Sequence, residues 1–149
     1  MKHLFIPDTQ VRAGAPVDHI KAAGKLILDE RPDVIVIIGD WWDFPSLSTH
    51  TPAPKTGYDH RTYIQDYQSG VDALYTLLAP MIHWNTKQKK NKKAQHRPRI
   101  VFTTGNHEDR VDRLLTQQTQ LVGALPLVGD VLAELGIEQY PFKIPVEID

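Results

Sequence analysis

Three short apolar runs constrain the fold of this chain more than any other feature of the sequence. They span residues 3–7 (HLFIP), 34–39 (VIVIIG) and 100–105 (IVFTTG), and each ends at a turn residue. Apolar runs without polar alternation are typical of strands that are buried on both faces of a sheet. Between them, apolar residues recur at helical spacing in residues 17–30 and 67–78. This order predicts an α/β fold with a mostly parallel sheet and helices on its faces.

Composition narrows the class of protein. With 149 residues, 41% of them apolar, the chain has enough material for one domain, which we expect to span residues 1–149. The net charge of −1 excludes a global electrostatic attraction to nucleic acid or to a lipid surface. The sequence has no cysteine, which excludes disulfides and thiolate metal sites. It also has no signal-like or membrane-length apolar stretch, so we expect a cytoplasmic protein with no membrane partner.

Two segments interrupt the alternation of strands and helices. Residues 45–61 are rich in Pro, Ser and Thr and are typical of a long loop, which could form a lid or a substrate wall. Residues 86–99 contain five lysines and two arginines. We interpret this basic segment as a solvated surface excursion, and contact with a nucleic-acid phosphate backbone is the alternative.

Polar residues follow each of the three apolar runs. Because the carboxyl ends of parallel strands meet at one edge of a sheet, these residues should lie together there. Carboxylates from separate strands repel one another unless a cation neutralises them, and oxygen and nitrogen donors suit Mn, Mg, Fe or Zn. Taken singly, each group is an ordinary turn, strand end or helix start, but together they predict a metal site. The six residues are Asp8, Gln10, Asp40, Asp43, Asn106 and His107.

The same residues form motifs that resemble those of the calcineurin-like metallophosphoesterases. The family pattern is D-x-H, G-D-x-x-D and G-N-H-[DE], and the chain has DTQ, GDWWD and GNHE at residues 8–10, 39–43 and 105–108. The stretches IPDTQV and GDWWDFPSLS are most similar to the phosphoesterases of tailed phages and prophages. The resemblance covers residues 2–109. It implies the layered sandwich of that family, hydrolysis of phosphate esters, nucleic acid among the candidate substrates, and the host cytoplasm if the protein is phage-encoded.

The resemblance assigns four residues to divalent metal ions. Asp8 and Asp40 would hold the first ion, Asp40 would bridge to a second, and Asn106 would bind the second through its amide oxygen and lie at the substrate. Gln10 stands where the family has its first histidine, and its amide oxygen is a weaker ligand than imidazole for Zn or Fe. We therefore expect Mn, with Mg, Fe and Zn as alternatives. Two such ions can activate a water molecule and bind the phosphoryl oxygens.

His107 is the catalytic residue that the resemblance implies. It would contact the scissile phosphate and protonate the leaving oxygen, so it must stay off the metals. A carboxylate should keep its imidazole protonated, and Asp43 is our candidate for this second catalytic role. Glu108 would support the metal ligands or favour the start of the next helix, where Asn106 could serve as the cap.

The later family motifs, G-H and G-H-x-H, have no counterpart, because the chain contains no histidine after His107. We therefore expect an incomplete domain with its C-terminal part missing and a poor phosphodiesterase when alone. It could be a fragment, a short form that completes its site from a partner chain, or a catalytically impaired paralogue. A non-catalytic module that binds phosphate or nucleic acid is the rival function. Alternating apolar residues in 142–148 predict a final strand, hence a homo-oligomer or a C-terminal partner segment.

Overall fold

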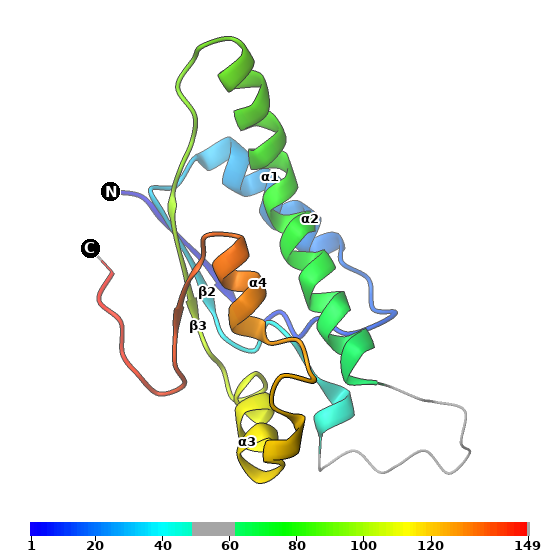
Figure 1. Cartoon of the computed structure of the whole chain (residues 1–149). Helices are drawn as coiled ribbons and strands as arrows, with labels where there is room; N and C mark the ends of the chain where they lie inside the picture. The colour runs from blue at the N-terminus through cyan, green and yellow to red at the C-terminus, as the bar shows by residue number, and fades with distance from the viewer. Residues whose placement is uncertain (49–61, 149) are drawn as a thin grey trace.

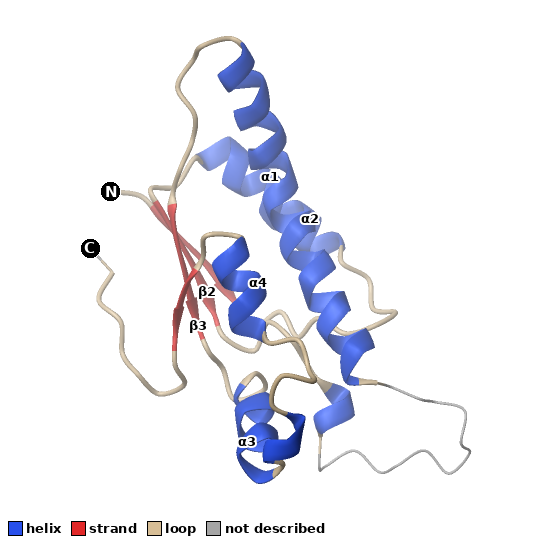
Figure 2. Cartoon of the chain, viewed as in Figure 1, coloured by secondary structure: helices blue, strands red, loops and turns tan. Residues whose placement is uncertain are grey.

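The computed structural model of the protein describes residues 1–48 and 62–148 and contains one four-stranded sheet (Figures 1 and 2). All strand pairs are parallel and the strand order is the chain order, which confirms the α/β class. The three predicted strands are confirmed, with ends that differ by at most two residues. The strands are β1 (His3–Pro7), β2 (Val34–Ile38), β3 (Arg99–Thr103) and β4 (Glu138–Tyr140).

Four α-helices connect and follow the strands. Both predicted helices are present, and the second is much longer than its apolar pattern indicated because it begins with a capping box of Thr62 and Gln65 and continues past its last buried residue. The predicted loop 45–61 is described only at its start, where Pro45–Leu47 forms the short 3-10 helix η1; residues 49–61 lie outside the described residues. The helices are α1 (Asp18–Glu30), α2 (Tyr63–Lys90), α3 (Asp109–Gln117) and α4 (Val128–Glu134), with a second 3-10 helix, η2 (Thr119–Leu121).

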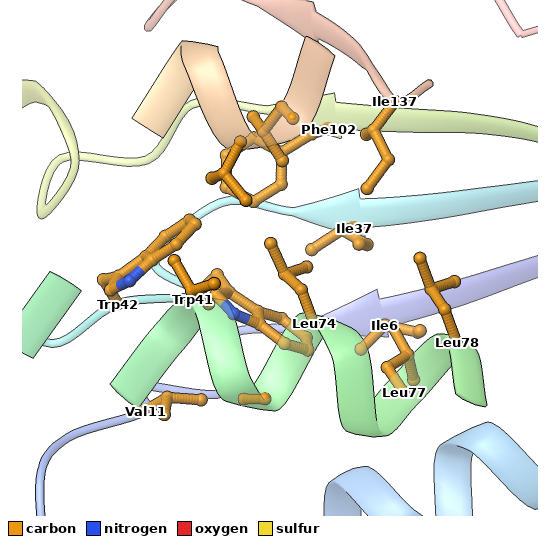
Figure 3. Packing of buried hydrophobic residues seen from close by; sticks show 14 of the residues in the cluster. Ile6, Val11, Ile37, Trp41, Trp42, Leu74, Leu77, Leu78, Phe102 and Ile137 are labelled. Atoms are coloured by element: carbon orange, nitrogen blue, oxygen red, sulfur yellow. The ribbon is translucent and has the colours of Figure 1, made fainter. Parts of the chain in front are cut away.

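The helices that contribute to the core cover one face of the sheet. Ile6, Ile37 and Phe102 are register partners on neighbouring strands, and they share one apolar cluster with buried residues of α1, α2 and α4 (Figures 1 and 3). Right-handed crossovers that always step to the next strand in the same direction place every helix on the same side. The described helices thus cover one face rather than both. On the other face, Phe5 and Ile38 remain 54% and 46% exposed.

The core joins the sheet to α2 and α1. Leu74, Leu77 and Leu78 of α2 are almost fully buried against the strand residues (Figure 3), and burying one such side chain contributes about 1.5–3 kcal/mol. The two helices meet closely at Gly24, where an added Cβ would lie 2.6 Å from the main-chain oxygen of Leu77. Only glycine permits that approach.

The basic segment 86–99 begins inside α2, which continues to Lys90, and its lysines are exposed, as expected of a solvated surface segment. The prediction of a final strand at residues 142–148 was wrong. Residues 142–148 form no strand, and β4 is the last strand that the structure describes. Pro141 and Pro145 have no N–H to donate, so this tail cannot continue a regular ladder despite its alternating apolar side chains.

Candidate metal and phosphate site

The ends of β1, β2 and β3 bring the six predicted polar residues to one edge of the sheet. Pro7, Ile38 and Thr103 are aligned in the register, so the three strands end level with one another. Each polar motif begins within three residues of these positions. The structure therefore places the three motifs on adjoining segments, as expected for parallel strands.

Main-chain hydrogen bonds join the first motif to the second. The N–H of Gln10 donates to the carbonyl of Asp40 at 2.9 Å, and the N–H of Val11 donates to the carbonyl of Trp41 at 2.7 Å. The N–H of Asp43 donates back to the carbonyl of Val11 at 3.0 Å. The two segments thus run side by side as a short parallel bridge beyond the sheet.

Two glycines let the second and third motifs approach. An added Cβ at Gly39 would lie 2.6 Å from the Cα of Gly105, and one at Gly105 would lie 2.2 Å from the Oδ1 of Asp40. Asp40 itself has a φ of 47°, a left-handed conformation that is uncommon for a residue with a side chain. Its Oδ1 accepts a hydrogen bond from the main-chain N–H of His107 at 2.9 Å. The glycines of GDWWD and GNHE are therefore required by close backbone packing.

The buried carboxylate of Glu108 links these two motifs through hydrogen bonds. Its side chain is 2% exposed, and its Oε2 accepts from the N–H groups of Asp40 and Gly105, both at 2.9 Å. Its Oε1 accepts from the N–H of Trp42 at 2.9 Å. Burial raises the pKa of Glu108 above its ordinary value, while these backbone donors oppose the rise. This is the supporting role that we expected for Glu108.

The expected capping roles at the start of α3 are wrong. The helix begins at Asp109 and Glu108 occupies its N-cap position, so Asn106 lies too early in the chain to be the cap. No side-chain cap bond is formed by Glu108, because its carboxylate is directed to the three backbone donors instead.

His107 lies against Asp43. Its Nδ1 is 2.7 Å from the main-chain oxygen of Asp43 and 3.3 Å from the carboxylate Oδ1. Because both neighbours are acceptors, Nδ1 carries a hydrogen, and Nε2 is the ring nitrogen left for an external partner. The side chains of His107 and Asp43 are 14% and 19% exposed. The carboxylate that we expected is present, but the shorter contact is to the main chain.

Trp41 and Trp42 position the second motif, a role that was not expected from the sequence. Both are fully buried, and their indole N–H groups donate to main-chain oxygens of α2, Trp41 to Gly70 and Trp42 to Tyr67, each at 3.0 Å (Figure 3). Gly70 leaves room for the indole ring of Trp42, because a Cβ there would overlap it. Two tryptophans inside a polar motif were the available signal.

Two arginines that the sequence motifs did not indicate lie close to Asp43. Arg110 donates from Nη1 to its main-chain oxygen at 3.0 Å, and Arg12 places Nη1 3.8 Å from its carboxylate. Arg110 also lines, with Asn106 and Arg113, a hollow of about 490 Å³ between η1 and α3. The spacing of Arg110 one helical turn after His107 could have indicated this proximity.

The predicted metal ligands have free oxygen atoms but little connection to one another. Asp8, Gln10 and Asn106 are exposed, and none of their side chains forms a hydrogen bond with the residues that the structure describes. Within the same residues no group of three or more His, Cys, Asp or Glu is arranged to hold a metal. The predicted set has only two carboxylates, Asp8 and Asp40, and takes its other oxygens from amides. Such a donor set fits a hard cation such as Mn or Mg that keeps several water ligands.

Among the predicted metal ligands, Asp8 has the weakest connection to the other two motifs. It borders an apolar hollow of about 330 Å³ between β1 and α1, which His19 and Ile20 also line. Gln10, two residues later, is joined to the second motif by one hydrogen bond, from its main-chain N–H to the carbonyl of Asp40.

No family model, curated protein or solved structure matches the chain. Among the helices that the structure describes, none is both long and apolar enough to cross a membrane.

Proposed function

We propose that the protein is a metal-dependent phosphoesterase of the calcineurin-like type, with the layered fold of that family. The observation that carries the proposal is the arrangement of His107. Asp43 holds its imidazole ring, and the main-chain N–H of His107 donates to the Oδ1 of Asp40. An acid and a candidate metal ligand are thereby held on adjacent segments. Metal-assisted hydrolysis of a phosphoester is accelerated when an acid lies beside the metal that activates the water.

Asp8, Gln10, Asp40 and Asn106 are the residues that would hold divalent cations, Mn foremost. Bound divalent cations act as Lewis acids that activate water and offset the charge of the phosphoryl oxygens. Glu108 fixes the main chain around Asp40 and Gly105 through buried hydrogen bonds, so the ligand-bearing segments are pre-organised.

His107 supplies the proton. Asp43 and its main-chain carbonyl hold the imidazole through Nδ1, which leaves Nε2 to protonate the leaving oxygen. Arg110 and Arg113 line the hollow beside Asn106 and can bind the remaining phosphate oxygens. Arg110 also donates to the main-chain oxygen of Asp43, so it connects this hollow to the residue that holds His107.

The test measures Mn²⁺ binding and hydrolysis of a small activated phosphodiester on the same variants. His107→Gln should lower kcat by about 10²- to 10⁴-fold and leave Mn²⁺ affinity unchanged. Asp40→Asn should weaken Mn²⁺ binding at least about tenfold, because it removes a charged ligand. Asp18→Asn, on the exposed start of α1, is the control and should change neither. Equal Mn²⁺ affinity in wild type and Asp40→Asn would refute the metal assignment.

A non-catalytic phosphate-binding module is the second candidate function. Two observations favour it. Among the described residues, no three acidic, His or Cys side chains are grouped to hold a metal, and arginines line the hollow beside Asn106. In that case inorganic phosphate should bind and Arg110→Gln should weaken it, while hydrolysis stays at the background rate with every metal.

A further inference from the structure

Charge is unevenly distributed along the chain. Seven of its 17 Lys and Arg residues lie in residues 86–99, and this segment contains no Asp or Glu. The remainder of the chain therefore carries ten basic residues against 18 acidic ones. A net charge near zero conceals a basic segment on an acidic protein. Such asymmetry is a signal for a polyanionic partner.

The basic segment occupies an end of α2 that projects from the molecule. A helix of 28 residues is about 42 Å long, whereas a five-residue strand spans only about 17 Å. Figure 1 shows the C-terminal end of α2 extending past the amino ends of the strands, opposite the end that carries α3. The last buried residue of α2 is Met81. Core packing therefore does not explain why the helix continues to Lys90.

The projecting end is held in a defined shape. The side chain of Asn85 donates to the main-chain oxygen of His96 at 2.7 Å and accepts from its N–H at 2.8 Å. The Nε2 of His96 lies 2.7 Å from the carbonyl of Pro32, and the guanidinium of Arg31 lies 4.4 Å from the ring centre of Trp84. These contacts tie the turn after α2 to the helix and to the start of β2. Its charges are presented at low entropic cost.

Six cations crowd this end, which we call the basic tip. All six are exposed, and none forms an ion pair within the part of the chain that the structure describes; Arg99, by contrast, is paired with Glu138 at 2.9 Å. The helix dipole favours lysines in the last turn of α2, but this accounts for only three of the six. The basic tip consists of Lys87, Lys89, Lys90, Lys92, Lys93 and Arg97.

We propose that the basic tip binds duplex nucleic acid through its phosphate backbone. Lys87 and Lys90 are three residues apart and share one side of the helix, whereas Lys89 lies on the opposite side. A helix about 10–12 Å across fits a major groove about 12 Å wide, so such cations can reach both flanking strands. This surface lies at the opposite end of the sheet from the candidate metal site and does not depend on the proposed function.

The residues between the cations favour nucleic acid over a membrane. Thr86, Gln88, Asn91 and Gln95 supply hydroxyl and amide groups of the kind that bond phosphate and sugar oxygens. From Asn85 to Arg97 there is no large apolar side chain to insert into lipid. Helices that lie on membranes need such an apolar face.

The experiment measures fluorescence anisotropy of a short labelled DNA duplex, in EDTA so that no hydrolysis occurs, between about 50 and 200 mM salt. Two triple variants change the net charge equally. The tip variant, Lys89→Gln/Lys92→Gln/Lys93→Gln, should weaken binding at least about tenfold and reduce the slope of log affinity against log salt by about 2.7. The control should shift affinity less than about twofold; it is Lys21→Gln/Lys25→Gln/Lys143→Gln.

Three results would overturn the proposal: no binding by the wild type, an equal loss in both triple variants, or tighter binding to anionic lipid vesicles than to the duplex. The tip variant should also hydrolyse the small phosphodiester as the wild type does. A loss confined to duplex binding therefore separates this surface from the candidate site, and inactivity of the wild type toward the small substrate would leave the binding result standing.

Discussion

Replacing Glu108 with glutamine should loosen the joint between the second and third motifs. The carboxylate accepts from three main-chain N–H groups, those of Asp40, Trp42 and Gly105. A glutamine has one acceptor oxygen, so its oxygen can keep the pair at Asp40 and Gly105 while its NH₂ faces the N–H of Trp42. One buried donor is then left without a partner, which costs about 1–3 kcal/mol.

Urea unfolding measures this change directly. Trp41 and Trp42 are fully buried, so their fluorescence reports the loss of the native core. With a slope of about 1–3 kcal/mol per M urea, Glu108→Gln should lower the midpoint by roughly 1 M. Manganese affinity should fall in the same variant, because the segment that carries Asp40 loses its support.

Asp109→Asn is the matched control, since it makes the same chemical change one residue later. Asp109 pairs with Arg113 at 3.0 Å, and the side chains of Arg113 and Asp109 are 61% and 26% exposed, so solvent screens the pair. Exposed pairs of this kind contribute less than about 1 kcal/mol. If Glu108→Gln proved as stable as Asp109→Asn, the three buried hydrogen bonds would not hold the motifs together as argued.

Two further predictions follow from other parts of the structure. Burial and, to a lesser extent, the nearby Tyr67 raise the pKa of Tyr63 above its ordinary value. Above pH 10 this tyrosine therefore loses its proton in the unfolded chain before it does so in the native state. The stability of the native state then falls as pH rises, by at most about 1.4 kcal/mol per pH unit. Tyr63→Phe should lose less stability between pH 9 and 11 than wild type, as measured by urea midpoints; parallel curves would contradict this. Self-association stays a prediction, now placed on the sheet face that the described helices leave uncovered, where Phe5 and Ile38 are exposed. Light scattering should show a dimer for the wild type and a monomer for Ile38→Lys, and a monomeric wild type at high concentration would rule it out.

The sequence by itself determined three of the four strands, the two main helices and the edge at which the polar motifs meet. Apolar runs such as VIVII of β2 are local patterns, and an apolar run placed between helices has few ways to be buried other than a parallel strand. The position of Asp40, Asn106 and His107 then follows from chain order alone. The pairing of Asp43 with His107 could also be predicted from the sequence, because few carboxylates follow a strand at that edge.

Tertiary structure alone decided how those motifs are joined. Glu108 meets the N–H groups of Asp40 and Trp42 across 68 and 66 residues of chain, and no local pattern encodes which donors a buried carboxylate will find. The same holds for the C-terminal end of α2. The helix continues beyond its buried apolar residues because hydrogen bonds between Asn85 and His96 close the turn that follows it. The single helical layer, too, follows from strand order, which is a property of the assembled sheet. Local periodicity specifies elements, whereas contacts between distant segments specify the site.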